Sequence, residues 1–274
     1  MSMADPLVSI VTPVLNAHRF VEGALESVAT QSYPQLEHVI VDAGSTDGTL
    51  EIVERYAARF PGRIRYISEP DCGPGDGWNK GLKLARGDIF GCIGADDLCE
   101  PGAVAAVVDF FKSTPGASFV NGECRRLRED GTTVIQRTEP FDFREYVNTS
   151  RHIATPSAYY RREAMERIGW LDSSGDDFDV MIRIAQNFEM HRLERVLSTL
   201  RLHRGSAFDA VDPRKRQLAL RETYKVSRNY GGCTLSPIAV NYYYFSLLVA
   251  LRLDPDARSA RWIARHGRRL TAWM

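Results

Sequence analysis

The sequence predicts an α/β protein in which helices flank a mostly parallel central sheet, with a helical extension at the C-terminal end. From residue 7 to about residue 125, short apolar runs alternate with amphipathic stretches, which is typical of βα units and a parallel sheet. Turn and capping signals precede the amphipathic stretches, for example Ser45-Thr46-Asp47 and Pro101. After residue 204 the pattern becomes helical, and no repeat or low-complexity segment interrupts the chain.

Each apolar run in the first 125 residues is expected to form a strand, and each amphipathic stretch a helix. The predicted strands are Leu7–Pro13, Leu36–Asp42, Ile64–Ser68, Ile89–Ile93 and Ser118–Asn121. The predicted helices are Phe20–Thr30, Thr49–Phe60, Gly77–Ala85 and Gly102–Phe111. Apolar residues recur at helical spacing in these four stretches, so one face of each helix is expected to pack on the sheet.

The rest of the chain has a mixed pattern, followed by a helical one. Two more strands are predicted at Thr132–Gln136 and Ala158–Arg161, and one helix at Phe178–Gln186. The last part is predicted to contain the helices Pro213–Tyr230, Ile238–Leu253 and Pro255–Trp273. We therefore expect one domain at residues 1–210, with halves at 1–125 and 126–210, and a helical extension at 211–274.

Composition narrows the class of protein. The chain has 274 residues and 44% hydrophobic residues, enough for a folded core. Lysine plus arginine equals aspartate plus glutamate at 35 each, so the molecule as a whole has no electrostatic preference for nucleic acid, and we expect none as a partner. The five cysteines are odd in number and form no C-x-x-C pair, and no secretory signal precedes the first strand; both indicate a cytoplasmic protein.

Polar side chains follow three of the predicted strands at the point where each strand ends. Asn16 follows the first strand, Asp42 ends the second, and Asp96-Asp97 follow the fourth. In open α/β sheets, ligands bind outside the carboxyl ends of the strands. This edge of the sheet is therefore where a nucleotide and its metal ion are expected.

Five segments of the first hundred residues resemble, in order and spacing, the nucleotide-sugar-binding half of family 2 glycosyltransferases with the GT-A fold. They are Val11-Thr12-Pro13-Val14-Leu15-Asn16, Val41-Asp42-Ala43-Gly44-Ser45-Thr46-Asp47-Gly48-Thr49, Ser68-Glu69-Pro70-Asp71, Trp78-Asn79-Lys80-Gly81 and Ala95-Asp96-Asp97. A Gly-Ser-Thr-Asp-Gly run alone is usually a turn before a helix. The resemblance therefore rests on the set of segments, and it implies a GT-A fold with an acceptor half after residue 125.

The resemblance also assigns roles to residues of these segments. Asp42 would bind the uracil or ribose; the alternative, which the surrounding motif disfavours, is a plain turn aspartate at a strand end. The donor pocket would be completed by Thr12, Pro13, Asn16, Asp71, Asn79 and Lys80. Asp96 would face the ribose, and Asp97 would ligate Mn²⁺ or Mg²⁺, for which carboxylate oxygens are suitable ligands. The alternative for Asp97, a cap of the following helix, has the wrong spacing.

Two further residues are assigned in the second half. Asp177, in Gly175-Asp176-Asp177-Phe178-Asp179, matches the family's catalytic base, and a helix N-terminus keeps such a carboxylate ionised. The other reading of Asp176 and Asp177 is that they are ordinary first-turn acids. His203 would be a second metal ligand, and a structural or exposed histidine is the equal alternative.

The expected activity is that of a metal-dependent, inverting hexosyltransferase. It would move a sugar from a nucleotide-sugar donor, UDP-linked in our expectation, to a hydroxyl of a glycan or lipid-linked acceptor, in the assembly of a bacterial-type surface polysaccharide or glycolipid. One rival is a nucleotidyltransferase, which normally has a glycine-rich, lysine-bearing loop after the first strand, whereas Pro13-Val14-Leu15-Asn16 is not such a loop. The other rival is an inactive nucleotide-sugar-binding scaffold.

The C-terminal helices leave two accounts open. The apolar run Ile238–Leu251 is shorter than the roughly 20 residues that span a bilayer. It could form ordinary core, or these helices could make a peripheral contact with the inner face of the membrane. The arginines and tryptophans of the last twenty residues favour the second account for the final helix.

Overall fold

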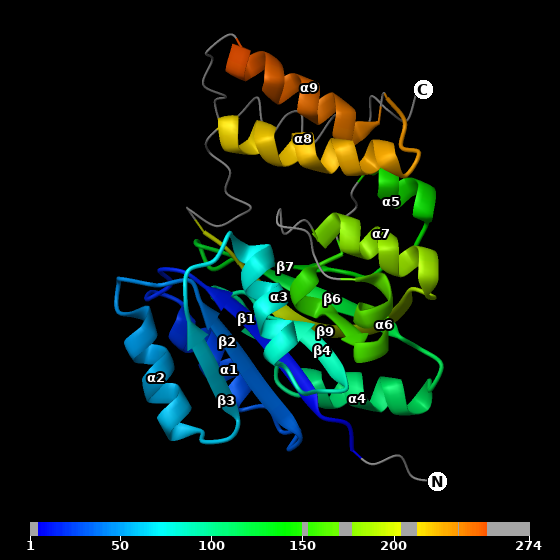
Figure 1. Cartoon of the computed structure of the whole chain (residues 1–274). Coiled ribbons are helices and arrows are strands. Elements are labelled where there is room, and N and C mark those ends of the chain that lie inside the picture. Colours follow the sequence, from blue (N-terminus) through cyan, green and yellow to red (C-terminus); the bar gives the residue numbers. More distant parts are fainter. Residues whose placement is uncertain (1–4, 150–152, 170–176, 204–212, 235, 251–274) are drawn as a thin grey trace. The chain divides into compact units, whose positions relative to one another are not determined.

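The computed structural model describes residues 5–149, 153–169, 177–203, 213–234 and 236–250. The chain forms two compact units. Figure 1 shows their helices and strands, coloured by position in the sequence. The first unit contains Met1–Pro140 and Ile153–Leu202, and the second contains Phe141–His152 and His203–Met274. The expected division into residues 1–210 and 211–274 remains a proposal.

Four parallel strands form one part of the sheet, in the order β3-β2-β1-β4. Their bounds are Val8–Val14 for β1, Leu36–Asp42 for β2, Ile64–Ser68 for β3 and Ile89–Cys92 for β4. Every position of β2 is buried, which is usual for a parallel strand covered by helices on both faces. The four strands predicted here are confirmed.

Five further strands continue the sheet beyond β4 in mixed directions. They are β5 (Leu98–Cys99), β6 (Phe119–Arg128), β7 (Thr133–Gln136), β8 (Ala158–Arg161) and β9 (His191–Leu202). Strand β8 lies antiparallel between β4 and β6, whereas β9 is parallel to β6. The predicted α/β fold with a mostly parallel sheet is confirmed, and its antiparallel pairs all involve this second part.

Strand β9 is the longest strand among the described residues, and the sequence pattern did not predict it. Its pairing with β6 shifts register between Gly122 and Glu123 and again between Glu123 and Cys124. Such irregularities break the alternation of apolar and polar residues by which strands are recognised. Three short elements were missed as well: β5, helix α5 (Phe143–Thr149) and helix α6 (Arg162–Ile168).

Helices cover both faces of the parallel strands. Helices α1 (Val21–Ala29), α2 (Thr49–Arg59) and α4 (Ala103–Ser113) pack through two apolar clusters on the face to which Val8 and Ile10 of β1 point. Helix α3 (Pro74–Leu84) lies on the other face, against Val11. All four were predicted, and α3 begins earlier than expected because Pro74 occupies its first turn, where proline is well tolerated.

The part of the first unit that follows β6 also contains a short 3₁₀ helix, Thr155–Ser157, and helix α7, Asp177–Asn187. Helix α7 confirms the helix predicted at Phe178–Gln186 and begins at Asp177 itself. Its buried residues, among them Phe178, Met181 and Ile184, recur at helical spacing, as an amphipathic helix requires. The N-terminus of α7 therefore carries one of the predicted functional residues.

The second unit is helical where it is described. Helices α8 (Pro213–Asn229) and α9 (Pro237–Ala250) pack on each other and confirm two of the three helices predicted here. Helix α5 joins them, since the Cys233 amide donates a hydrogen bond of 2.7 Å to the Asn148 side chain. The third predicted helix, Pro255–Trp273, lies outside the described residues.

Close approach of α3 to the sheet depends on Gly81. A Cβ atom at Gly81 would lie 2.2 Å from Cγ1 of Val11, so Gly81→Ala forces the helix away from β1. Alanine improves helix propensity by about 1 kcal/mol, but overpacking typically costs about 1–3 kcal/mol. We expect Gly81→Ala to lower the free energy of unfolding, measured from urea transitions.

The matched control is Gly116→Ala, because a Cβ there meets no atom within 4 Å. That variant should be neutral or slightly more stable. Equal urea midpoints for the two variants would contradict the account of α3 packing.

Candidate functional site

The loops after β1 and β2 are joined by hydrogen bonds between backbone and side chains. The Asn16 amide donates to Ser45 Oγ at 2.9 Å, and the Thr46 amide donates to Asn16 Oδ1 at 2.9 Å. Asn16 has a φ of 49°, the left-handed region that asparagine tolerates better than most residues. Asn16 thus links two of the three loops predicted to bind the donor.

The next two residues of the first loop continue this link. The Ala17 amide donates to Thr49 Oγ1 at 2.8 Å, and the His18 amide donates to Asp47 Oδ2 at 3.1 Å. The Thr49 hydroxyl donates to Asp47 Oδ1 at 2.5 Å. That hydrogen bond, together with the amides of His18 and Thr49, lowers the pKa of the exposed Asp47 carboxyl below its ordinary value.

Asp42 is fully buried at the end of β2 and organises the turn that follows. Its carboxylate accepts hydrogen bonds from the Gly44 amide at 3.1 Å, the Ser45 amide at 3.1 Å and the Ser68 hydroxyl at 2.6 Å. These are the contacts of a turn aspartate, the alternative reading of this residue. Recognition of a nucleobase by Asp42 remains a prediction.

Thr12 and Pro13 point to opposite faces of β1. The Thr12 hydroxyl is buried and lies 2.9 Å from His38 Nε2. Burial, and then the charge of Arg63, lowers the pKa of His38 to about 3, so the imidazole is neutral at physiological pH. Because the hydroxyl is held in the core, we do not expect the Thr12 side chain to contact a ligand. Pro13 faces Gly77 of α3 instead.

Asp71 lies beside Pro13 at the start of α3. Its Oδ1 accepts a hydrogen bond of 2.9 Å from the Gly73 amide, and a Cβ at Gly77 would lie 2.9 Å from its Oδ2 and 3.0 Å from Pro13 Cβ. The structure therefore brings Asp71 to the end of β1, as the donor pocket requires.

Lys80 is engaged in a local network. Its Nζ donates to the Pro70 carbonyl at 2.7 Å and lies 3.0 Å from Glu69 and 3.5 Å from Asp76. The hydrogen bond with Glu69 and the nearby charge of Asp76 raise the pKa of Lys80. Lys80 thus holds the Glu69–Pro70 segment against α3, and the half-buried Asn79 precedes it on the same helix.

Asp97 is buried, with 6% of its surface exposed. The Arg201 amide, near the end of β9, donates to Asp97 Oδ1 at 3.1 Å, and Arg201 Nη1 donates to the Asp96 carbonyl at 3.3 Å. A Cβ at Gly94 would lie 2.6 Å from Asp97 Oδ2, so a side chain at this position would displace the carboxylate. Helix α4 has Gly102 as its N-cap, so Asp97 does not cap it.

The structure brings Asp177 to the same edge as Asp97. Burial, followed by the negative charges of Asp97 and Asp177, raises the pKa of the Cys92 thiol to about 12. The Thr155 hydroxyl donates a hydrogen bond to Asp177 Oδ2. Burial and then the charge of Asp177 also raise the pKa of Tyr160. Thr155 precedes β8, whose Tyr159 pairs with Gly91 near the end of β4, so Asp177 lies near the strand end that Asp97 follows.

The structure describes Asp179 of the acidic run but not Asp176. Asp179 pairs with Arg183 at 2.7 Å, one turn along α7, which is an ordinary i,i+4 contact. Arg183 also donates to the Ile168 carbonyl at 2.6 Å. Asp176 lies outside the described residues.

The carboxylates at this edge are suitable ligands for a divalent cation whose coordination is completed by substrate phosphates. Mg²⁺ and Mn²⁺ are commonly held by one or two carboxylates plus substrate phosphates, and Asp96 and Asp97 supply such carboxylates. Over the described ranges, no three histidine, cysteine, aspartate or glutamate side chains gather as a metal cluster. His203 begins the second segment of the second unit, and its role as a ligand remains a prediction.

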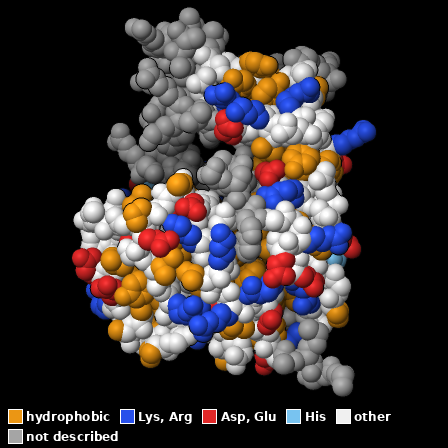
Figure 2. Space-filling model, viewed as in Figure 1, with side chains coloured by type: hydrophobic (Ala, Val, Ile, Leu, Met, Phe, Trp, Pro, Cys, Tyr) orange, Lys and Arg blue, Asp and Glu red, His pale blue; other side chains and the backbone are white. Residues whose placement is uncertain are grey.

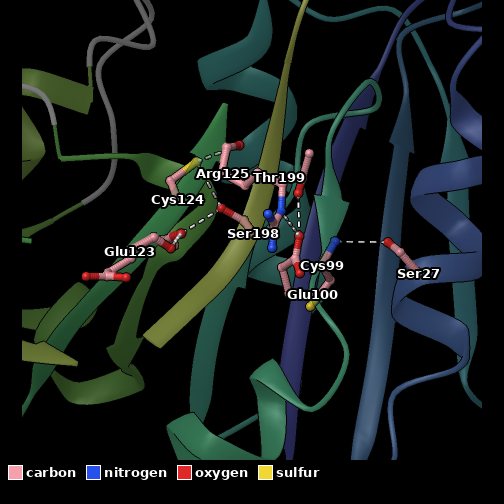
Figure 3. A network of polar contacts seen from close by, with 9 residues as sticks. Ser27, Cys99, Glu100, Glu123, Cys124, Arg125, Ser198 and Thr199 are labelled. Carbon is pink, nitrogen blue, oxygen red and sulfur yellow. Dashed lines mark hydrogen bonds and ion pairs between the residues drawn. The ribbon is translucent and has the colours of Figure 1, made fainter. Parts of the chain in front are cut away.

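Sequence reasoning missed the polar network that anchors β9 (Figure 3). Glu100 Oε1 accepts hydrogen bonds from the Thr199 hydroxyl and from Arg125 Nε, the latter at 3.2 Å. Next to it, the Cys99 amide donates to Ser27 Oγ at 3.0 Å. These contacts tie β5 to β9, β6 and α1. No local pattern indicates them, because their partners are distant in sequence.

A second set of contacts in Figure 3 holds the middle of β9. The hydroxyls of Ser157 and Ser198 lie 2.6 Å apart, and Ser198 Oγ lies 3.5 Å from Cys124 Sγ. Ser157 also donates to the Glu123 carbonyl at 2.9 Å. The register of β9 is thereby set, and with it the position of the Arg201 amide.

Comparison with known proteins gives a consistent result. Residues 9–169 match the sequence model of Glycosyl transferase family 2. The chain is 35% identical to a chondroitin synthase of Escherichia coli over 129 residues, 47% of this chain and 19% of that protein. It is 32% identical to a PGL/p-HBAD biosynthesis glycosyltransferase of Mycobacterium tuberculosis over 173 residues, 61% of this chain and 64% of that protein. It thus spans less than two thirds of either relative.

Two solved structures share the fold. One is the mannosyltransferase PcManGT from Pyrobaculum calidifontis in complex with GDP-Man and Mn²⁺, with a TM-score of 0.63, 20% identity, and coverage of 97% of this chain and 81% of that one. The other is S. aureus TarS in complex with UDP-GlcNAc, with a TM-score of 0.61, 18% identity, and coverage of 87% and 72%.

The hydrogen bond from Thr49 to Asp47 predicts a measurable change in the pKa of Asp47. Thr49→Val removes the hydroxyl that donates to Asp47, so the pKa of Asp47 should rise toward its ordinary value of 3.8, measured by NMR of the carboxyl carbon. Since the folded-state pKa is depressed, the stability that Asp47 contributes is complete above about pH 4 and is lost as pH falls through the folded value. Asp130, which Thr132 holds in the same way, is the internal control and should not shift. An unchanged Asp47 pKa would refute the contact.

Proposed function

The chain belongs to glycosyl transferase family 2 and has the GT-A fold, and from this premise we propose that it transfers a hexosyl group from a nucleotide sugar to an acceptor hydroxyl. The placement of Asp97 and Asp177 at one end of β4 carries this proposal: Asp97 follows β4, and Asp177 accepts a hydrogen bond from Thr155, just before the start of β8, which pairs with the end of β4. The transfer uses one carboxylate on the diphosphate side and another on the acceptor side. The donor loops lie at the same sheet edge, where ligands of α/β proteins bind.

The diphosphate side is assigned to Asp96 and Asp97. With His203 as a further candidate, these residues would hold Mn²⁺ or Mg²⁺ together with the phosphates. A bound cation supplies neutralisation of the charge that develops on the leaving diphosphate. The burial of Asp97 supports this role, since a buried carboxylate gains from a nearby positive charge.

The acceptor side is assigned to Asp177 as general base. Asp177 lies in the first turn of α7, and the Thr155 hydroxyl, which donates a hydrogen bond to one of its oxygens, orients the carboxylate. Asp177 takes the proton of the acceptor hydroxyl while the acceptor oxygen forms a bond to the anomeric carbon. The bond from that carbon to the diphosphate breaks on the opposite face. A single displacement of this kind inverts the anomeric configuration.

The donor is proposed to be UDP-linked. The residues assigned to the donor are Pro13 in β1, Asn16 after it, Asp42 in β2, Asp71 before α3, and Asn79 and Lys80 on α3. Local hydrogen bonds of Asn16, Asp42, Asp71 and Lys80 fix these segments, which supports a rigid seat for a nucleotide. The TarS complex with UDP-GlcNAc supports a uridine nucleotide, whereas the PcManGT complex contains GDP-Man. The buried Trp78, which packs on Tyr160 at 6.3 Å between ring centroids, lies next to Asn79 and is a candidate wall for the sugar.

The acceptor is proposed to be a glycan or lipid-linked glycan in polysaccharide or glycolipid assembly, and we expect the protein to act in the cytoplasm. The two relatives support this class, since one is named a chondroitin synthase and the other a PGL/p-HBAD biosynthesis glycosyltransferase.

The proposal is tested first with a panel of nucleotide sugars. Donors that bind the folded state should raise the melting temperature, and with Mn²⁺ they should release nucleoside diphosphate. Release of pyrophosphate would identify a nucleotidyltransferase. Binding with no release, with and without acceptor glycans, would identify a scaffold.

Asp97→Asn should abolish the metal dependence of UDP binding. The amide lacks the negative charge of the carboxylate but keeps its shape, so the fold should persist while UDP affinity becomes insensitive to EDTA. Isothermal titration with and without Mn²⁺ measures this. Asp109→Asn, an exposed carboxylate on α4, is the control. Mn²⁺ dependence that survives in Asp97→Asn would remove Asp97 from the metal site, and the same titration on His203→Ala tests the histidine.

Asp177→Asn should lower kcat by a factor of about 10² or more, with UDP affinity nearly unchanged, because the base acts only on the acceptor. Turnover is measured as nucleoside diphosphate released from the best donor of the panel in the presence of acceptor. Asp179→Asn is the control on the same helix, since Asp179 pairs with Arg183. Normal turnover in Asp177→Asn together with loss in Asp176→Asn would move the base to Asp176.

A further inference from the structure

The charge of this neutral chain is segregated along the sequence. Residues 203–274 contain thirteen Lys and Arg and five Asp and Glu, whereas residues 1–202 contain twenty-two and thirty. The C-terminal region therefore carries a net charge of +8 and the rest a net charge of −8. Whole-chain neutrality conceals a strongly basic second unit, and such a region attracts anionic surfaces.

Helix α8 presents part of this charge on one face. Tyr224 and Lys225 lie three and four residues after Arg221, and Arg228 lies four and three residues after them, which places the four side chains on one side of a helix. The side chains of Arg221 and Lys225 are 52% and 51% exposed. This face is therefore accessible to a partner.

Tyrosines of α9 lie beside these cations. The ring of Tyr224 stacks on Tyr242 at 5.5 Å between centroids and meets Tyr243 edge-on at 5.9 Å. Tyr243 is 54% exposed, and Val240, one turn earlier, is 38% exposed. We call the set the tyrosine–arginine patch: Arg221, Tyr224, Lys225, Arg228, Tyr242 and Tyr243. Figure 2 shows Lys and Arg side chains next to hydrophobic ones over α8 and α9.

One acidic residue lies within the patch. Glu222 is 2.9 Å from Lys225 and 4.0 Å from Arg221. Exposed ion pairs of this kind are weak, so they do not prevent the cations from binding another anion. Three cations against one carboxylate leave the patch positive.

We propose that the tyrosine–arginine patch docks on the surface of an anionic lipid bilayer. Arginine and lysine attract the phosphates of anionic lipids, and exposed tyrosines settle at the level of the headgroups, so the two kinds of side chain together match a lipid interface. The patch rests on the surface, because no helix in the described part of the chain is long and apolar enough to cross a membrane. This docking goes beyond the transfer chemistry and concentrates the enzyme where lipid-linked acceptors reside.

The test is flotation of the full chain with two kinds of vesicle. We expect binding to vesicles of equal parts phosphatidylglycerol and phosphatidylcholine, little binding to phosphatidylcholine alone, and release in high salt. The double variant Arg221→Glu with Lys225→Glu should reduce the partition coefficient at least about tenfold. Tyr243→Ala, a milder change at an exposed side chain, should reduce it less and serves if the double variant does not fold.

The matched control is Arg55→Glu with Arg59→Glu on α2. It changes the net charge by the same amount at side chains that are 59% and 57% exposed, also paired with glutamates, and should bind vesicles like the unchanged chain. Equal losses in the two double variants, or undiminished binding of the patch variants, would overturn the proposal.

Two further results would also overturn it. One is equal binding to vesicles without anionic lipid. The other is self-association without vesicle binding, detected by sedimentation and lost in the patch variant, which would make the patch an interface between copies. The patch variants should release nucleoside diphosphate from soluble donors at the normal rate. Failure of donor turnover with vesicle binding intact would count against the proposed function and leave the docking surface standing.

Discussion

The burial of the Asp97 carboxylate is the constraint on which the candidate site depends. A buried charge is costly unless hydrogen bonds or an opposite charge offset it. The Arg201 amide donates one hydrogen bond, and Gly94 leaves room for the carboxylate. The first condition requires β9 to end beside the segment between β4 and β5. The second part of the sheet therefore completes an environment that β4 alone does not provide.

The position of β9 follows from polar contacts rather than from apolar packing alone. Glu100 accepts hydrogen bonds from Thr199 and Arg125, and the Ser157–Ser198 contact lies one residue earlier in β9. Buried polar networks select one register, because any slip leaves several groups without partners. The network thus has no assigned part in the proposed chemistry, but it decides where the Arg201 amide meets Asp97.

Hydrogen bonds also join the loop after β1 to the loop after β2, on the side assigned to the donor. Three successive amides of the first loop, from Asn16 to His18, bond to side chains of the loop after β2. Residues that look like separate motif positions therefore support each other. A nucleotide binding here would meet a preorganised seat, which lowers the entropic cost of binding. The second unit has no such loop pair among its described residues. Its exposed surface instead presents the cationic and aromatic side chains of the tyrosine–arginine patch.

The sequence by itself determined the parallel strands, the helices that cover them, and the family. These depend on local patterns: apolar runs, helical spacing and turn residues that act over a few positions. The acidic segments at strand ends could also be recognised from the sequence, and the structure brings Asp97 and Asp177 to one edge. Local patterns are sufficient where secondary structure and strand ends decide the position of a residue.

Tertiary structure alone decided the rest. Strand β9 escaped prediction because its pairing with β6 shifts register, which removes the regular alternation. Thr12 stands within a matching segment, yet its hydroxyl is turned to His38 in the core, since adjacent residues of a strand face opposite sides of the sheet. Which face a side chain takes and which distant strand lies beside it are set by packing of the whole sheet, and no short stretch of sequence contains that information.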